Sequence, residues 1–170
     1  SECGDINKEF HVLEIRNGVE RAIQFDKEAL IENPTRVLGY SQGKKTLEFF
    51  IPEVILAVVG SVSCKCWCFA TSNGSIYIIS HYGRLMLPRI SIGHKVVKLT
   101  IEKSHLIILT ERGLIYVWNL ISLKNIHKNI PILPVLNNEP IQCHRVRINK
   151  TITHIGLTSD KNQDITIQLT

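Results

Sequence analysis

The chain has 170 residues, of which 44% are hydrophobic and 21% charged, and its formal net charge at pH 7 is +5. This composition is that of a globular domain large enough to bury a core without disulfides or metal ions. Its longest apolar runs, residues 54–59 and 106–109, are too short to cross a bilayer, so we expect no membrane contact. No secretion signal opens the chain, and its start at Ser1 favours a fragment of a longer protein.

Residues 1–35 are predicted to form an amino-terminal strand followed by an irregular or helical excursion. Within residues 18–33, apolar side chains are loosely spaced at three and four positions, and Pro34 disfavours helix at Asn33. A helix and an irregular segment both fit this pattern. We treat residues 36–170 as the main domain.

The main domain is predicted to be all-β, with little helix. Residues 36–40 and 47–51 flank Gln42-Gly43 as a first hairpin. Further short runs rich in β-branched residues are separated by glycine, asparagine, aspartate or charged clusters. These runs are residues 76–79, 96–101, 106–110, 114–118 and 165–169.

Three of the five cysteines alternate within one apolar run, as Cys64, Cys66 and Cys68. Alternation places them on one face of a strand, where we expect buried, reduced thiols. The segment offers no fourth ligand and no Cys-x-x-Cys spacing, so no metal is predicted. Reduced thiols are typical of the cytosol or the nucleus.

Residues 67–79 repeat as residues 106–118, so that Thr71 and Thr110 stand 39 positions apart. Each copy reads as a strand, a turn with glycine, and a second strand, with hairpin turns predicted at Asn73-Gly74 and Arg112-Gly113. A period near 40, with Trp118-Asn119 in place of a Trp-Asp pair, is typical of WD-type β-propeller blades.

A third copy is predicted near the end of the chain. Residues 155–160 resemble residues 98–103, and residues 166–170 resemble residues 106–110. Two to three partial blades cannot close a ring, so the rest of the protein or another subunit must cover the open edges. The sequence therefore predicts antiparallel, propeller-like hairpins that take part in an assembly.

Catalytic patterns are missing from the sequence. The seven histidines form no metal-binding pair, and no nucleophile elbow or phosphate-binding glycine loop occurs. We therefore expect no enzyme and no cofactor. Direct binding of nucleic acid stays as an alternative, because several basic residues would serve it if they gathered on one face. These residues are Lys95, Lys98, Lys103, Arg112 and residues 144–147.

Residues 74–88, 113–120 and 124–130 together resemble the carboxy-terminal domain of the HIRA/Hir family, most closely the fungal Hir proteins. The matching positions are Gly74, Tyr77, Gly83, Arg84, Leu85, Pro88, Gly113, Val117, Trp118, Asn119, Leu120, Lys128, Asn129 and residues 133–136. The likeness extends over about residues 36–136.

The resemblance implies a non-enzymatic scaffold or oligomerisation domain of a HIR-type histone H3–H4 chaperone complex. Such complexes act in the nucleus, in replication-independent nucleosome assembly and transcriptional repression. The domain is expected to associate with itself and with other complex subunits, and to reach histones H3–H4 indirectly through the complex. Direct contact with DNA is a secondary expectation.

Five residues are candidates for a subunit interface: Trp118, Asn119, Leu120, Tyr82 and Arg84. Trp118 has two possible roles, packing within its own sheet or anchoring a partner. Asn119 either orients a turn or bonds across the interface. Tyr82 and Arg84 follow a strand, where they form a contact patch or a solvated loop.

Overall fold

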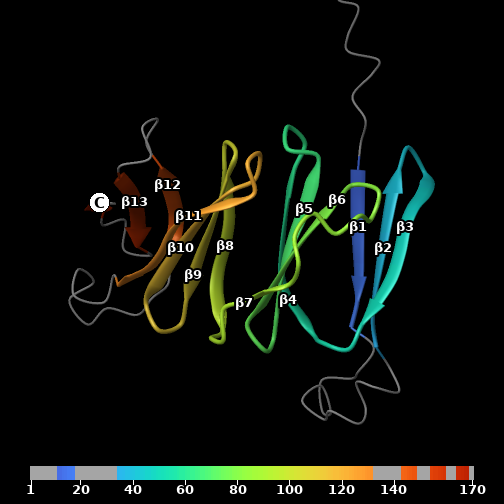
Figure 1. Ribbon diagram of the computed structural model, residues 1–170, viewed down its shortest axis with the longest axis horizontal. Helices are drawn as coiled ribbons and strands as arrows, with labels where there is room; N and C mark the ends of the chain where they lie inside the picture. The colour runs from blue at the N-terminus through green and yellow to red at the C-terminus, as the bar shows by residue number, and fades with distance from the viewer. Residues whose placement is uncertain (1–10, 18–33, 132–142, 149–153, 160–163, 169–170) are drawn as a thin grey trace, which may run out of the picture.

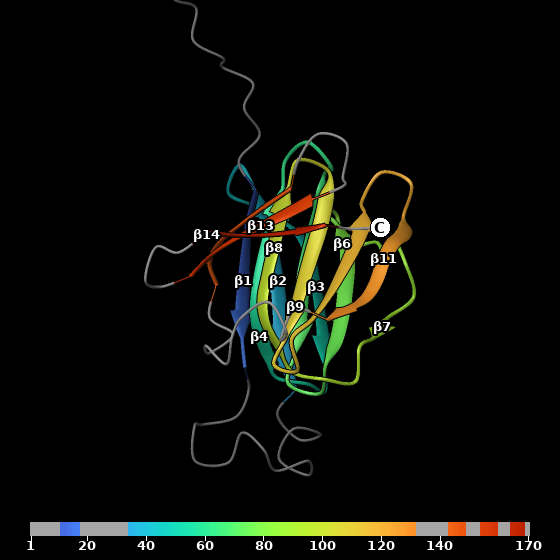
Figure 2. The same cartoon turned by 90° about the vertical axis from the view of Figure 1, so that its left-hand side faces the viewer.

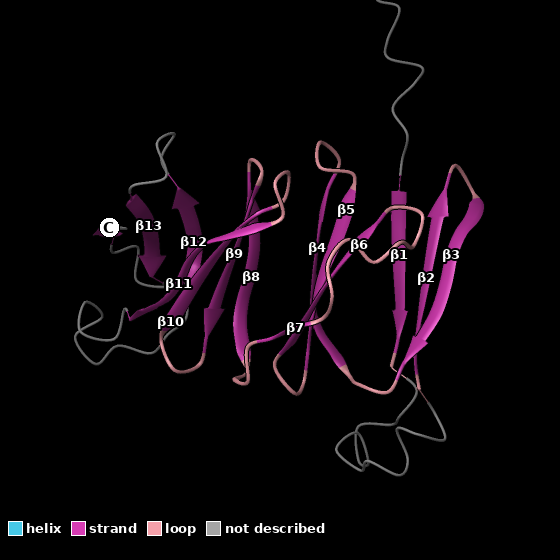
Figure 3. Ribbon diagram, viewed as in Figure 1, coloured by secondary structure: helices cyan, strands magenta, loops and turns pink. Residues whose placement is uncertain are grey.

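The computed structural model describes residues 11–17, 34–131, 143–148, 154–159 and 164–168. All regular elements in these ranges are β-strands, and Figure 3 shows no helix among them. The predicted all-β class is confirmed. The helical or irregular alternative for residues 18–33 lies outside the described residues.

The strands form four antiparallel sheets, which we name blades A to D. Blade A contains β1 (His11–Arg16), β2 (Thr35–Ser41) and β3 (Lys44–Ile51). Blade B contains β4 (Ile55–Ser61), β5 (Cys66–Thr71), β6 (Ser75–Ser80) and β7 (Ile90–Ser91). Blade C contains β8 (Val96–Glu102), β9 (His105–Thr110), β10 (Leu114–Asn119) and β11 (Lys124–Pro131). Blade D contains β12 (Cys143–Ile148), β13 (His154–Ser159) and β14 (Asp164–Gln168).

Within each blade the strands follow chain order, and the blades stand side by side in a row (Figure 1). Seen from the end of the row, β1, β4 and β8 lie along one side of the molecule, whereas β7 and β11 lie along the other (Figure 2). This is a propeller-like stack of hairpins. It has four sheets, rather than the two to three blades expected from the sequence.

The predicted hairpin turns at Gly74 and Gly113 are confirmed. Their φ angles are +79° and +71°, in the left-handed region that glycine tolerates best. The amide of Gly74 donates to the Thr71 carbonyl at 3.1 Å, and the amide of Gly113 donates to the Thr110 carbonyl at 3.0 Å. A side chain at Gly74 would also collide with the His94 carbonyl oxygen, 2.6 Å from the position of a Cβ.

Blade D corrects the predicted third copy. The sequence comparison paired residues 155–160 with the first strand of blade C, but these residues form the second strand, β13, and β12 precedes them. β12 lies against β8, as β8 lies against β4, so β12 is the first strand of its blade. The alignment was therefore wrong by one strand. Alternating apolar residues occur in every strand of a blade and do not encode the strand's place in it.

Blade B is packed on both faces because its side chains alternate. One face carries Cys66 and Cys68, which pack with Ile108 of blade C and are fully buried. The other face carries Phe69 and Ile79, which pack with hydrophobic residues of blade A: Leu13, Ile15, Val37, Leu47 and Phe49. Two apolar layers therefore join the three blades.

The cysteine prediction is confirmed for the two strand residues. Cys66 and Cys68 are buried free thiols, and both the hydrogen bond with Cys66 and burial raise the pKa of Cys68. Cys64 differs from the prediction, because it lies in the turn before β5 and is only half-buried. It still packs against the same apolar layer.

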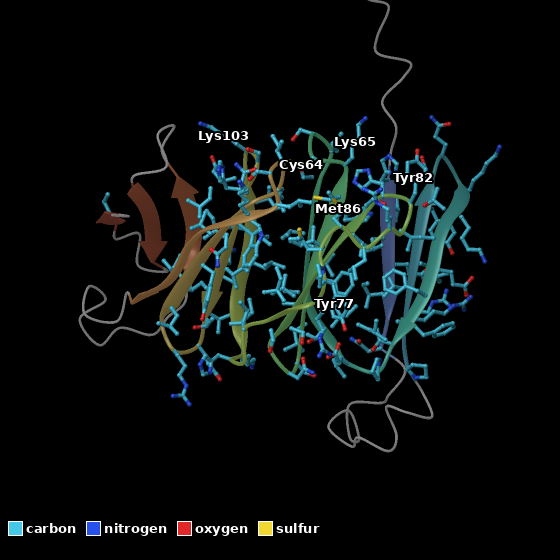
Figure 4. The ribbon with its side chains drawn as sticks, viewed as in Figure 1. Cys64, Lys65, Tyr77, Tyr82, Met86 and Lys103 are labelled. Atoms are coloured by element: carbon cyan, nitrogen blue, oxygen red, sulfur yellow. The ribbon has the colours of Figure 1, made fainter. Side chains whose placement is uncertain are left out.

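Glu53 connects blades A and B. Its partner Tyr77 is labelled in Figure 4 and lies nearer the end of the stack opposite Tyr82. Its carboxylate accepts hydrogen bonds from Asn73 Nδ2 at 2.6 Å, the Tyr77 hydroxyl at 2.7 Å and Arg89 Nη1 at 3.2 Å. Its carbonyl accepts from the Thr35 hydroxyl at 2.6 Å. Burial and the nearby Glu53 carboxylate raise the pKa of Tyr77.

Candidate interaction surface

All five sequence-predicted interface residues lie toward one end of the stack. We call it the upper end, defined by the segments 62–65, 81–84, 103–104 and 120–123 that follow β4, β6, β8 and β10. Backbone hydrogen bonds tie these segments together in pairs. The His81 amide donates to the Lys65 carbonyl at 3.1 Å, and the Leu120 amide donates to the Ser104 carbonyl at 2.8 Å.

Trp118 packs within its own sheet. It lies opposite Leu106 of β9 and Asn125 of β11, and its half-buried ring contacts the apolar layer between blades B and C. Its indole N–H donates to the Leu123 carbonyl at 3.2 Å. The side chain therefore closes the β10–β11 turn, and a role as partner anchor stays a prediction.

Asn119 orients the same turn. Its side-chain oxygen accepts the amides of Ile121 at 2.8 Å and Ser122 at 2.9 Å, the arrangement of an Asx turn. Leu120 is only 2% exposed and belongs to the core. The turn instead presents Ile121, whose side chain is 75% exposed.

Tyr82 and Arg84 are both exposed on a fixed loop. The Gly83 amide donates to the Ser80 carbonyl at 3.0 Å, and the Arg84 carbonyl accepts the Ser80 amide at 2.8 Å. The neighbouring His81 is buried, its ring 4.0 Å from that of His11. Tyr82 stands edge-on to the same His11 ring, so the loop holds it in a defined position while leaving it 64% exposed.

Sequence reasoning missed two exposed apolar residues at this end. Val62 and Ile121 are 76% and 75% exposed. They were missed because the sequence does not show whether a hydrophobic side chain in a tight turn is buried or exposed. The exposed cations of the same end are Lys44, Lys65, Arg84, Lys103 and Lys124. In Figure 4, Lys65, Tyr82 and Lys103 lie along this side of the stack. Exposed apolar side chains with polar or charged residues around them are typical of a protein-binding surface.

His105 lies within the upper end, paired with Asn119 in the neighbouring strand. The residue is 8% exposed, and its Nε2 has no hydrogen-bond partner in the described part of the chain. Burial, and then the positive charge of Lys103, lowers the pKa of His105. The imidazole is therefore held in its neutral form.

Among the described side chains, the basic residues predicted for nucleic-acid binding are spread from one end of the stack to the other. Lys95 precedes β8 and Lys103 follows it, which puts a strand of seven residues between them. Arg112 lies in the turn at the lower end, on the side of Lys95. The side chains of residues 144–147 lie outside the described set.

No metal centre appears among the described side chains, since no three His, Cys, Asp or Glu residues there stand close enough to share an ion. The described part of the chain also contains no helix that is long and apolar enough to span a membrane.

Comparison with known proteins finds a matching domain family and similar fungal proteins. Residues 83–162 match the family model "Hira: TUP1-like enhancer of split". The chain is 49% identical over 160 residues to Protein HIR1 of Eremothecium gossypii and 48% identical over 161 residues to Protein HIR1 of Kluyveromyces lactis. These matches cover 94% and 95% of the chain, but only 19% of each relative.

The fold has a counterpart among solved structures. The crystal structure of HIRA(644-1017) matches 94% of this chain with a TM-score of 0.68 and 16% identity, and the chain covers 49% of that structure. At this identity the match concerns the fold alone. The sequence matches alone identify a Hira-family domain in the chain and make the chain a homologue of the fungal HIR1 proteins.

Proposed function

We propose that this chain is a non-enzymatic scaffold and oligomerisation region of a HIR-type histone H3–H4 chaperone complex. The complex would act in the nucleus, in replication-independent nucleosome assembly and transcriptional repression. The family match and the names of the fungal relatives support a chromatin role. The chain spans about a fifth of those relatives, so its own contribution is argued from its surface.

One observation carries the proposal: the upper end holds exposed apolar side chains on rigid turns beside exposed cations. Tyr82 and Ile121 are 64% and 75% exposed, yet the hydrogen bonds within their turns fix both positions. Burying such preformed groups costs little conformational entropy, which favours stable association. We assign the partners as other subunits of the complex and further copies of this chain, with histones H3–H4 held indirectly.

The test is the double variant Tyr82→Asp/Ile121→Asp, measured by light scattering and by sedimentation with the purified partner subunits. We expect association to weaken by at least about 30-fold, because each change puts a charge into the contact. Val97→Asp is the matched control, since Val97 is 41% exposed but lies near the other end of blade C. Unchanged mass and unchanged partner binding in the double variant would refute the proposal.

The alternative, direct binding of nucleic acid, makes a different prediction. Binding through phosphate contacts weakens steeply as salt rises, whereas an interface with an apolar centre changes little. The separation of Lys95 from Lys103 along β8 gives no support to a single phosphate-binding face. We therefore place the protein–protein role first.

A further inference from the structure

Among the described residues, no segment pairs with the outer edge of blade A as a fourth segment does in blades B and C. In blade C, β11 pairs with the third strand, β10. In blade B, the segment 84–92 runs alongside the third strand, β6. The Met86 amide donates to the Ile78 carbonyl at 2.9 Å, and Ile90 pairs with Ile76. In blade A, the third strand β3 pairs with β2 on one side and with no described strand on the other. Figure 2 shows blade A ending at β3, where its neighbours continue to β7 and β11.

The chain that follows β3 cannot fill this edge. β3 ends at Ile51 and β4 begins at Ile55, which leaves three residues between them. An eight-residue strand such as β3 is about 26 Å long. The connection is also held in place, because the Glu53 carbonyl accepts the Thr35 hydroxyl at 2.6 Å and the Val54 carbonyl accepts the Ser72 amide at 2.8 Å. A fourth strand must therefore come from elsewhere.

Charged residues and Pro52 flank the edge but leave residues 49–51 uncharged. Edge strands usually avoid further pairing through charged residues or proline. β3 begins with Lys44 and Lys45 but continues into the uncharged residues Phe49, Phe50 and Ile51. Phe49 faces blade B, so alternation places Phe50 on the outer face of blade A, where it is 57% exposed. A strand added here would cover an exposed aromatic ring.

Charge indicates the direction and chemistry of the added strand. Lys45 Nζ and Arg36 Nη2 lie 2.6 Å and 2.7 Å from the Glu48 carboxylate and lower its pKa, so Glu48 is already compensated. Lys44 is exposed and forms no ion pair with any described residue. An antiparallel strand, the arrangement of the other blades, would bring its carboxy-terminal end beside Lys44.

We propose that β3 is a docking edge for an extended segment of a partner protein, which adds as the antiparallel fourth strand of blade A. The segment carries alternating apolar side chains, one of them over Phe50, and an acidic residue at its carboxy-terminal end beside Lys44. Main-chain hydrogen bonds supply the binding, and the alternate side chains supply the selectivity. Only Lys44 of this edge also lies at the upper end, and the proposal does not depend on the function proposed for the upper end.

The probe is a ten-residue peptide that alternates valine and threonine and ends in two aspartates. Its control has the same sequence with prolines at two central positions, which removes main-chain donors. Residue-resolved hydrogen exchange of the protein alone should show fast exchange at alternate β3 amides, because half the amides of an edge strand face solvent. The valine–threonine peptide should slow these amides at least tenfold, and the proline peptide should not.

Two matched variants locate the contact. Phe50 and Val12 are both 57% exposed on the outer face of blade A, but they lie on opposite edge strands. Phe50→Lys should weaken peptide binding at least tenfold, whereas Val12→Lys should leave it unchanged. Lys44→Glu should weaken binding of the peptide that ends in aspartates. The same variant should bind a peptide that ends in two lysines more tightly than the unchanged protein does.

Three results would overturn the proposal. β3 amides that are already slow in the protein alone would show that a segment of the same chain occupies the edge. Protection at a different edge, or equal effects of the Phe50 and Val12 variants, would remove the assignment to β3. Absence of peptide binding at millimolar concentration would show that β3 is not a docking edge.

Discussion

The hydroxyl groups of Thr71 and Thr110 occupy equivalent places in two turns that lie 39 residues apart. Thr71 Oγ1 accepts the amide of Ser75 at 3.2 Å, and Thr110 Oγ1 accepts the amide of Leu114 at 3.2 Å. Both threonines are fully buried. Each hydroxyl thus satisfies the first amide of the strand that leaves the turn. The surroundings differ, because Ser75 is buried whereas Leu114 is half-exposed.

Thr71→Val should lower the free energy of unfolding by about 1–3 kcal/mol, because it leaves the Ser75 amide buried without an acceptor. Thr110→Val should cost less, since water can reach the Leu114 amide. Urea denaturation measures both changes, and Thr71→Ser, which keeps the hydroxyl, is the control. Equal losses for the two valine variants would contradict this account.

The turns could be predicted from the sequence because Gly74 and Gly113 occupy the same place in a repeated strand–turn–strand pattern, a strong local signal. The place of a strand within its blade could not be predicted, since apolar alternation is the same in every strand, and blade D was misaligned for this reason. The role of Trp118 was left open because it depends on where the Leu123 carbonyl points, and Leu123 has a φ of +59° that its residue type does not encode.

Glu53 was missed for a related reason. A single glutamate between two predicted strands looks like an ordinary solvated linker residue. Its burial depends on partners 20, 24 and 36 positions further along the chain, at Asn73, Tyr77 and Arg89. The folding of blade B brings these three groups to Glu53, because they lie in its β5–β6 turn, in β6 and just before β7. Contacts at such separations leave no local pattern.

Replacing Glu53 tests this junction. Glu53→Leu should lower the free energy of unfolding by about 2 kcal/mol, because three donors lose a charged acceptor. Glu48→Leu is the matched control: Glu48 also contacts two cations, Arg36 and Lys45, but on the exposed face of blade A. That change should cost clearly less stability than Glu53→Leu, because water screens the exposed ion pairs. Similar costs for the two variants would show that the burial of Glu53 contributes little.

The buried His105 predicts a stability that depends on pH. Its pKa in the folded protein is lowered by burial and by Lys103, so the unfolded chain binds the proton more readily. The contribution is fully present above the ordinary histidine pKa of 6.5 and is lost as pH falls through the lowered value. His105→Leu should make the free energy of unfolding depend less on pH between about pH 7 and pH 5. Lys103→Gln should reduce this pH dependence less, since burial lowers the pKa of His105 more than Lys103 does. A slope unchanged by His105→Leu would contradict the assignment.

The three clustered cysteines should differ in reactivity. Cys66 and Cys68 are fully buried, which keeps a reagent from both thiols, and the pKa of Cys68 is raised, so little thiolate forms there. Cys64 is half-buried in a turn. A thiol-alkylating reagent should therefore label Cys64 in the folded protein and reach the other two only after unfolding. Peptide mapping by mass spectrometry reads the three positions separately. Labelling of Cys68 in the folded protein at the rate of Cys64 would show that β5 opens locally.

Trp118 and Asn119 provide the last test. Alanine at both positions removes the indole bond to the Leu123 carbonyl, the ring's contacts with the apolar layer, and the acceptor for the Ile121 and Ser122 amides. We expect the free energy of unfolding to fall by about 3 kcal/mol, as for a core aromatic residue. We also expect weaker association, because the turn would no longer hold Ile121 in place. Thermal melting and light scattering on the same sample measure the two effects.

The single variant Ile121→Asp separates the two effects of that double change. It leaves Trp118 and Asn119 intact, so it should keep the melting temperature while lowering the associated mass. Loss of stability in the double variant, with association unchanged in Ile121→Asp, would make Trp118 a core residue only. If the double variant instead keeps both its stability and its mass, then neither residue has the role assigned to it, because a half-buried tryptophan that closes a turn cannot be removed at no cost to a fold that depends on it.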